Sequence, residues 1–259
     1  MSGKYAKKKN NRFPVILLIL LLVAAAAAVV IMQTRDGGEA NSPSGTEPVS
    51  TTESTATEQT EAATEKPTEL PMPDGIDLGN GLVITDVGSY TGAFVEDGTD
   101  EQVSDVLMIE VYNYGVAPVQ YAEISLATGN ETANFTLSTL PVGETMRVLE
   151  KTRMAFDENA EYTQAAAQNV AQFQKPMSLC QDKIQIQSLD GAMNIVNISG
   201  QDITGEVIVY YKNIADGMLQ GGITYRVRFA EGMKKDEVRQ IMTNHYSSSG
   251  SRVMFVTCG

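Results

Sequence analysis

The chain has 259 residues, room for one large or two small domains, and its 19 Lys+Arg and 32 Asp+Glu give a formal net charge of −13. Five of the basic residues lie in residues 1–12, so 14 remain against all 32 acidic residues in the rest of the chain. This acidity argues against DNA, RNA or an anionic membrane surface as the main partner. Two cysteines and one histidine exclude a zinc cluster.

The N-terminus predicts a membrane anchor. Residues 1–12 are basic without an acidic residue, and residues 13–32, FPVILLILLLVAAAAAVVIM, are apolar and uncharged. A helix of about 20 residues spans about 30 Å, the thickness of a bilayer core, and satisfies its own backbone hydrogen bonds. Basic residues stay on the cytoplasmic side. We therefore expect a cytoplasmic tail (1–12) and a signal anchor (13–32) that contacts the lipid bilayer, in a single-pass protein of the cell membrane with extracellular C-terminal domains.

A cleaved signal peptide is the alternative for the same segment. The basic start fits, and AAAAA (24–28) offers the small residues of a cleavage site. The apolar run continues through VVIM instead of turning polar, which favours retention of the anchor. In both cases the bulk of the chain is exported.

Residues 33–75 predict a disordered stalk. They are dominated by Thr, Ser, Glu, Ala and Pro and have almost nothing to bury, so they cannot offset the entropy lost on ordering. A flexible coil of this length has an r.m.s. span of roughly 35–40 Å, enough to lift a domain clear of lipid headgroups. The Thr/Ser/Pro composition also suits O-glycosylation.

Residues 76–176 predict a first β-domain. Short apolar runs rich in Val, Ile, Tyr, Phe and Thr alternate with turn residues, as in half-buried strands. The turn LPVG (140–143) combines a proline with a closing glycine. The segment 156–176 suits either a helix or a loop followed by a strand. The expected strands are 81–90, 105–113, 119–127, 133–140 and 144–151.

Residues 177–259 predict a second β-domain. In TYRVRF (224–229), Tyr225, Val227 and Phe229 should point inward, and Arg226 and Arg228 outward. Many short strands at this spacing favour sandwiches or barrels. The expected strands are 183–189, 192–198, 203–213, 222–230, 237–242 and 251–257.

The two segments share a local pattern. IEVYNYGVAPVQYAEISL (109–126) followed by LSTLPVGETMRV (137–148) resembles the bacterial envelope immunoglobulin-like modules of the CARDB and FxLYD kind, and IVNISGQDITGEVIVYYKN (195–213) partly repeats it. In the second copy, FAEGMKKDEV (229–238) replaces the L-x-P-G-E turn. The resemblance implies a mainly β chain, with two tandem Ig-like β-sandwich domains after the transmembrane helix and the disordered linker, and no common active site.

The sequence favours a non-enzyme without a cofactor. His245 has Ser247, Ser248 and Ser249 beside it, but sequence neighbours do not make a catalytic triad. The acidic stretch 95–105 offers oxygen ligands but lacks the spacing of a calcium loop. No phosphate-loop, nucleophile-elbow or C-x-x-C motif is present.

Two groups of residues are candidates for other roles. Cys180 and Cys258 flank the second domain on the exported side, where a disulfide persists; two unpaired thiols are the alternative. Pairing of the strands 203–213 and 222–230 would gather aromatic and cationic side chains near the histidine, although alternation turns half of them into the core. The candidate partner-binding residues are Tyr211, Lys212, Arg226, Arg228 and His245.

Two functions fit these features. One is a membrane-anchored extracytoplasmic binding or structural protein of a Gram-positive envelope, which presents tandem β-sandwich domains to an envelope protein or cell-wall polymer. The other is a non-catalytic accessory subunit of a membrane transport, secretion or surface-assembly complex. In that case the small residues 24–28 would let a partner helix approach closely.

Overall fold

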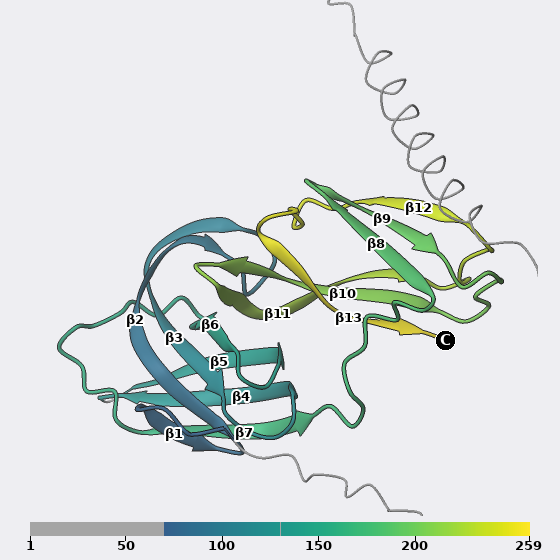
Figure 1. Ribbon diagram of the computed structural model, residues 1–259. Coiled ribbons are helices and arrows are strands. Elements are labelled where there is room, and N and C mark those ends of the chain that lie inside the picture. Colours follow the sequence, from purple (N-terminus) through teal and green to yellow (C-terminus); the bar gives the residue numbers. More distant parts are fainter. Residues whose placement is uncertain (1–69, 130) are drawn as a thin grey trace, which may run out of the picture. The chain divides into compact units, whose positions relative to one another are not determined.

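The computed structural model describes residues 70–129 and 131–259 (Figure 1). These residues belong to one compact unit. The predicted tail (1–12), the predicted anchor (13–32) and most of the predicted stalk (33–75) lie outside the described residues. Within the described residues, no helix is long and apolar enough to cross a membrane.

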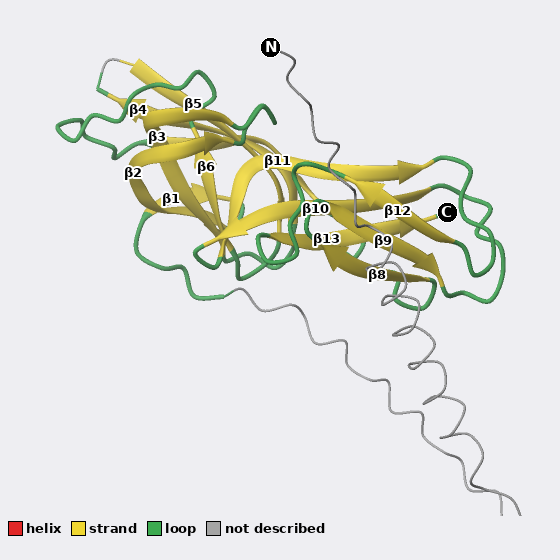
Figure 2. Ribbon diagram, turned by 90° about the horizontal axis from the view of Figure 1, so that it is seen from above, coloured by secondary structure: helices red, strands yellow, loops and turns green. Residues whose placement is uncertain are grey.

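The described chain is mainly β, as predicted, with strands joined by loops (Figure 2). We call residues 70–172 the first half. In it β1, β2, β3 and β6 lie side by side in one sheet, and β5, β4 and β7 form another. The strands are β1 (Ile76–Gly79), β2 (Leu82–Phe94), β3 (Glu101–Asn113), β4 (Val119–Thr128), β5 (Glu131–Leu140), β6 (Thr145–Leu149) and β7 (Ala165–Gln172).

Residues 178–259, the second half, repeat this connectivity. Strand β9 pairs with β8 and β12, as β3 pairs with β2 and β6, and β10 pairs with β11 and β13, as β4 pairs with β5 and β7. The predicted domain limits, 76–176 and 177–259, stay predictions. The strands are β8 (Ile184–Leu189), β9 (Ala192–Asn197), β10 (Val207–Ala215), β11 (Met218–Phe229), β12 (Val238–Met242) and β13 (Ser251–Cys258).

One short parallel pairing joins the halves. Leu219 and Gln220 of β11 lie opposite Met146 and Arg147 of β6, so the order β1-β2-β3-β6-β11-β10-β13 forms a single seven-stranded sheet. Strands β10, β11 and β13 therefore belong both to the second half and to a sheet that begins in the first (Figure 1).

The first core explains why β3 contains a continuous apolar run. Leu107 and Ile109 point into the main cluster, where they meet Phe135 and other residues of β4, β5 and β6. Val106 and Met108 point to the opposite face and pack in a smaller cluster with Phe94 and Leu149. Both faces of β3 are buried, so the run does not alternate with polar residues.

The second core confirms the alternation predicted for TYRVRF. Phe229 is buried in the cluster of the second half, and Tyr225 and Val227 pack against it, while Arg226 and Arg228 are exposed. Fully burying a large apolar side chain contributes about 1.5–3 kcal/mol. This periodicity therefore fixes which face of β11 is covered.

A buried asparagine closes the loop after β3. Asn113 donates from Nδ2 to the carbonyls of Ala117 and Leu140, both at 3.1 Å, and its Oδ1 accepts from Gly115 N at 3.0 Å. The side chain thereby satisfies backbone groups that the end of the strand leaves unpaired.

Asn197 makes the corresponding hydrogen bonds in the loop after β9. Its Nδ2 donates to the carbonyls of Gln201, Met233 and Lys234, and its Oδ1 accepts from Ser199 N at 3.0 Å. The distant turn that each asparagine contacts also has the same backbone conformation in the two halves. Gly143 (φ 75°) and Asp236 (φ 59°) both take the left-handed conformation one residue before a glutamate whose carbonyl accepts from the asparagine N–H. MKKDE (233–237) is therefore a structural counterpart of LPVGE (140–144).

The segment 156–176, for which a helix or a loop was expected before a strand, contains no helix. It is a loop followed by β7, which pairs with β4 along its alanines, Ala165 to Ala167. A helix here would leave one edge of β4 without a partner.

Candidate functional site

A polar cleft of about 640 Å³ lies where the two halves meet. Its walls come from the β2–β3 hairpin, β6, the β10–β11 hairpin and the loop between β12 and β13. The volume lies within the range of small-molecule sites. The neutral polar side chains that line it include Ser89, Thr91, Asn213, Gln220, Asn244 and Ser251.

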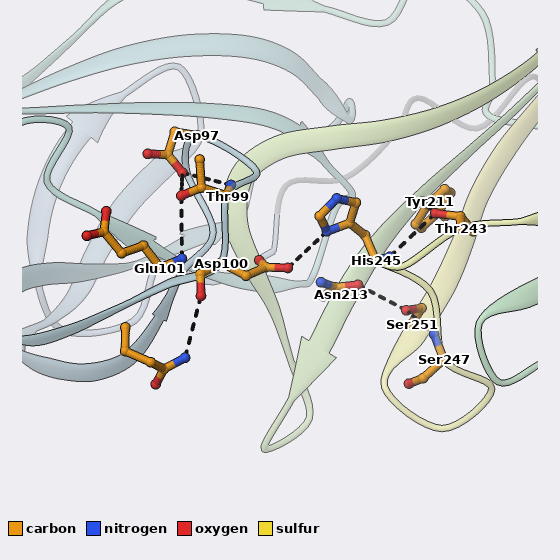
Figure 3. A network of polar contacts seen from close by, with 11 residues as sticks. Asp97, Thr99, Asp100, Glu101, Tyr211, Asn213, Thr243, His245, Ser247 and Ser251 are labelled. Atoms are coloured by element: carbon orange, nitrogen blue, oxygen red, sulfur yellow. Dashed lines mark hydrogen bonds and ion pairs between the residues drawn. The ribbon is translucent and has the colours of Figure 1, made fainter. Parts of the chain in front are cut away.

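His245 and Asp100 meet across this cleft (Figure 3). Asp100 follows the tip of the β2–β3 hairpin, His245 lies in the β12–β13 loop, and Nδ1 is 2.9 Å from Oδ2. Their side chains are 31% and 39% exposed. A pair this exposed contributes less than about 1 kcal/mol, so its main effect is to orient the imidazole.

The imidazole of His245 belongs to a cluster of stacked aromatic rings. His245 stacks on Tyr225 with centroids 4.9 Å apart, Tyr225 stacks on Tyr211 at 5.3 Å, and Tyr246 meets Tyr211 edge-on at 5.1 Å. Burial raises the pKa of Tyr225 to about 12, and its hydroxyl is buried without a hydrogen-bond partner among the described residues. The rings fix the face that the imidazole presents to the cleft.

The cationic side chain of the cleft is neutralised by its neighbours. Arg147 Nη2 lies 2.9 Å from Glu110 Oε1, and Nη1 lies 3.7 Å from Asp216 Oδ2. With two acidic neighbours, the guanidinium does not offer a free positive charge to an anion. The cleft therefore suits a neutral polar ligand better than a charged one.

The serines beside His245 serve the loop that holds them. Ser251 Oγ accepts from Ser247 N at 3.1 Å and donates to Asn213 Oδ1 at 3.0 Å, and Ser247 Oγ accepts from Gly250 N at 2.9 Å. Within the described residues, no hydrogen bond joins the imidazole to a hydroxyl group. The geometry closes a loop and does not form a nucleophile–base pair.

Two ionisable side chains with strongly shifted pKa values, Glu96 and Lys212, lie at the seam between β6 and β11. Glu96, beyond the end of β2, accepts from Leu149 N at 2.9 Å and from Gly222 N at 2.7 Å. Burial raises the pKa of Glu96 to about 7, although these two hydrogen bonds and the charge of Lys212 oppose the shift. One carboxylate thus holds a backbone amide of each half.

Lys212 is fully buried and donates from Nζ to the carbonyls of Gly221 at 2.8 Å and Ile223 at 2.5 Å. Burial lowers its pKa to about 7, and the charge of Glu96 opposes this shift. Between these carbonyls, a Cβ at Gly222 would come within 1.6 Å of Thr136 O. Only glycine permits so close an approach of β11 to β5.

The acidic stretch 95–105 is used for internal contacts. Asp97 accepts from Thr99 and pairs with Arg153, which also pairs with Glu101 at 2.8 Å. Asp105 accepts from Ser89 Oγ. Among the described residues, no group of three or more His, Cys, Asp or Glu side chains is placed to hold a metal ion.

The structure does not bring the five predicted contact residues onto one surface. Tyr211 and Lys212 are both buried, and the pairing of β10 with β11 and with β13 is irregular at this point. Arg226 and Arg228 are exposed on the outer face of β11, and only His245 lines the polar cleft. The sequence analysis missed Asp100 and Arg147, whose partners lie far away in the chain.

Cys180 lies beside Cys258, the last residue of β13. Cys180 Sγ donates to Val256 O at 3.3 Å. Burial, then a hydrogen bond with the Cys180 thiol, raises the pKa of Cys258 to about 12. Both are thiols in the structure, and the disulfide stays a prediction.

No protein-family model matches the sequence, and no curated protein or solved structure matches the chain.

Proposed function

We propose that this chain is a membrane-anchored extracytoplasmic binding or structural protein that presents two tandem Ig-like β-sandwich domains to an envelope partner. The observation that carries the proposal is the polar cleft, because both halves build it and neither would form it alone. The repeated connectivity and the paired asparagines support two Ig-like modules of the CARDB/FxLYD kind. We further propose that the protein is not an enzyme.

The exported topology is testable on intact cells. With one epitope tag before residue 13 and another after Gly259, added protease should remove the C-terminal tag and spare the N-terminal one. Survival of the C-terminal tag with loss of the N-terminal tag would refute the proposal. Crosslinking the full chain in its native envelope, with a photoreactive residue in place of the cleft residue Asn244, should then capture the partner.

The accessory-subunit alternative draws its support from the small residues 24–28 of the predicted anchor. Replacing residues 13–32 by an unrelated apolar helix separates the two functions. Retained function supports a simple anchor, and lost function with normal export supports a specific helix contact.

A further inference from the structure

A second cavity, of about 820 Å³, lies against the outer face of β10, β11 and β13. Both halves contribute to it, and residues 173–177, which connect them, form one wall. We call it the cationic groove. It is distinct from the polar cleft and shares no lining residue with it.

Aromatic rings form one side of the cationic groove. Arg226, Tyr210 and Phe255 lie in one row across β11, β10 and β13. The ring of Tyr210 stacks on Phe255 with centroids 4.1 Å apart and planes 13° apart, and Phe173 meets Phe255 edge-on at 5.2 Å. Three adjacent strands hold this row in place, so the rings are positioned before any ligand arrives.

The charge of the groove is opposite to that of the protein. Its charged lining residues are Lys175 and Arg226, both exposed, and no acidic side chain lines it. Among the described residues, neither cation takes part in a salt bridge. Arg228, two positions along β11, is paired with Glu206 and does not line the groove. In a chain of net charge −13, an acid-free cavity with two unpaired cations favours an anion.

The remaining lining is suited to a polyhydroxylated ligand. The exposed side chains of Thr257, Gln120 and Gln174 line the same space as the rings, whereas the hydroxyl groups of Thr139 and Thr224 are hydrogen-bonded to each other at 3.0 Å. A guanidinium binds a carboxylate or phosphate through two parallel hydrogen bonds, and the parts of the Tyr210 and Phe255 rings outside their mutual stack offer an apolar surface to a sugar. An acidic peptide would satisfy the cations but would make less use of the hydroxyl and amide lining.

We propose that the cationic groove binds an anionic polysaccharide, whose carboxylate or phosphate groups contact Arg226 and Lys175 and whose sugar rings lie against Tyr210 and Phe255. This inference rests on the proposed function, since it names the chemical class of the partner. It assigns that partner to a surface other than the polar cleft.

The test uses the full chain in uncharged lipid nanodiscs and four probes: hexagalacturonate, its neutral methyl ester, a glycerol phosphate oligomer and hexaglutamate peptide. We expect saturable binding of hexagalacturonate that weakens as salt is raised, and at least tenfold weaker binding of the methyl ester. The glycerol phosphate oligomer is an anion without a sugar ring: weaker binding than that of hexagalacturonate supports the contact of sugar rings with Tyr210 and Phe255, and equal affinity would overturn it.

The matched variants are Arg226→Gln with Lys175→Gln against Arg228→Gln, which is on the same strand and outside the groove. The first pair should lower the affinity for hexagalacturonate at least tenfold, and Arg228→Gln should stay within twofold. Unchanged thermal unfolding would show that each variant is folded.

Equal binding of the methyl ester, equal binding of hexaglutamate peptide, or unchanged affinity in the double variant would overturn the inference. These results leave the proposed function standing, because the removal of the C-terminal tag by protease is measured separately. A refuted topology together with specific binding in nanodiscs would remove the proposed function alone.

Discussion

The two halves of the molecule have the same strand connectivity but hairpins of different length. In the first half, β2 and β3 have 13 residues each, whereas β8 and β9, their counterparts, have 6 each. The extra length takes the tip of the first hairpin to the second half, where Glu96 accepts from Gly222 N and Asp100 meets His245. The repeated part builds a core, and the part without a counterpart builds the junction and the polar cleft.

The two halves also share a buried asparagine at the end of a strand. Asn113 and Asn197 occupy equivalent strand ends, and each hydrogen-bonds carbonyls of its own loop and of a turn far away in the chain. Both are completely buried. An asparagine that ties a loop to a distant turn is therefore part of how each half closes, whatever its surface binds.

The largest expected effect concerns the second half alone, which holds both cysteines. Incubation with glutathione disulfide should join Cys180 to Cys258, with release of two reduced glutathione molecules for each bridge formed. A loop of this length adds about 4 kcal/mol to the free energy of unfolding in the chain-entropy model. Denaturant unfolding with and without reductant measures the difference. The Cys180→Ser, Cys258→Ser double variant should be insensitive, and thiols that stay titratable after oxidation would contradict the prediction.

Next come the two asparagines. Asn113→Ala and Asn197→Ala each leave buried carbonyls without a donor, so each should lower the free energy of unfolding by about 2–3 kcal/mol. Asn159→Ala, on an exposed loop, should change it by less than about 0.5 kcal/mol. A lowered free energy of unfolding in only one of these two variants would mean that the halves do not close in the same way.

The free energy of unfolding should depend on pH through Glu96, which lies at the junction of the two halves. The pKa of Glu96 is raised from 4.5 to about 7, so the folded state binds more protons than the unfolded state between these values. Stability from this group is complete below pH 4.5 and is lost as the pH rises through 7, by roughly 3 kcal/mol. Glu96→Gln should remove this slope, whereas the exposed control Glu131→Gln should retain it. An unchanged slope in Glu96→Gln would place its origin elsewhere.

Lys212 should give a dependence of stability on pH that has the opposite sign. Its lowered pKa of about 7 means that stability from this group is present above pH 10.5 and is lost as the pH falls through 7. The slope from Glu96 therefore lies between pH 4.5 and 7, and the slope from Lys212 lies between pH 7 and 10.5. Titrating Glu96→Gln from pH 4.5 to 10.5 separates them.

The smallest effect tests the equivalence of the two turns. Asp236 has φ 59° where Gly143 has φ 75°. Asp236→Gly relieves a left-handed aspartate and should raise the free energy of unfolding by up to about 1 kcal/mol, while Gly143→Asp should lower it by about the same amount. Effects of the same sign in both variants would mean that the turns are not equivalent.

Much of the fold could be predicted from local patterns. The alternation of TYRVRF placed Phe229 in the core, and the apolar runs located most strands within a few residues, because half-buried strands leave a period of two. The prediction ended the first strand at Tyr90, although β2 continues to Phe94. The pairing of β2 with β3 is irregular between Tyr90 and Gly92, where the predicted strand ends.

The site was harder to predict because it depends on distant pairs. Nothing local connects Asp100 with His245 or Glu96 with Gly222, which are separated by 145 and 126 positions. One signal was present: Lys212 follows the apolar run VIVYY, where a charge must find partners if the strand is buried. The sequence predicts a surface contact for Lys212 instead, because irregular pairing in β10 cannot be inferred from it.

The claim that most needs testing is that the long hairpin locks the two halves into one body. Residual dipolar couplings of backbone amides, measured for residues 70–259, test it directly. The account predicts that a single alignment tensor fits the couplings of the first and second halves together. Two tensors of different magnitude or orientation would contradict it, because the halves would then tumble independently and the polar cleft between them would not persist.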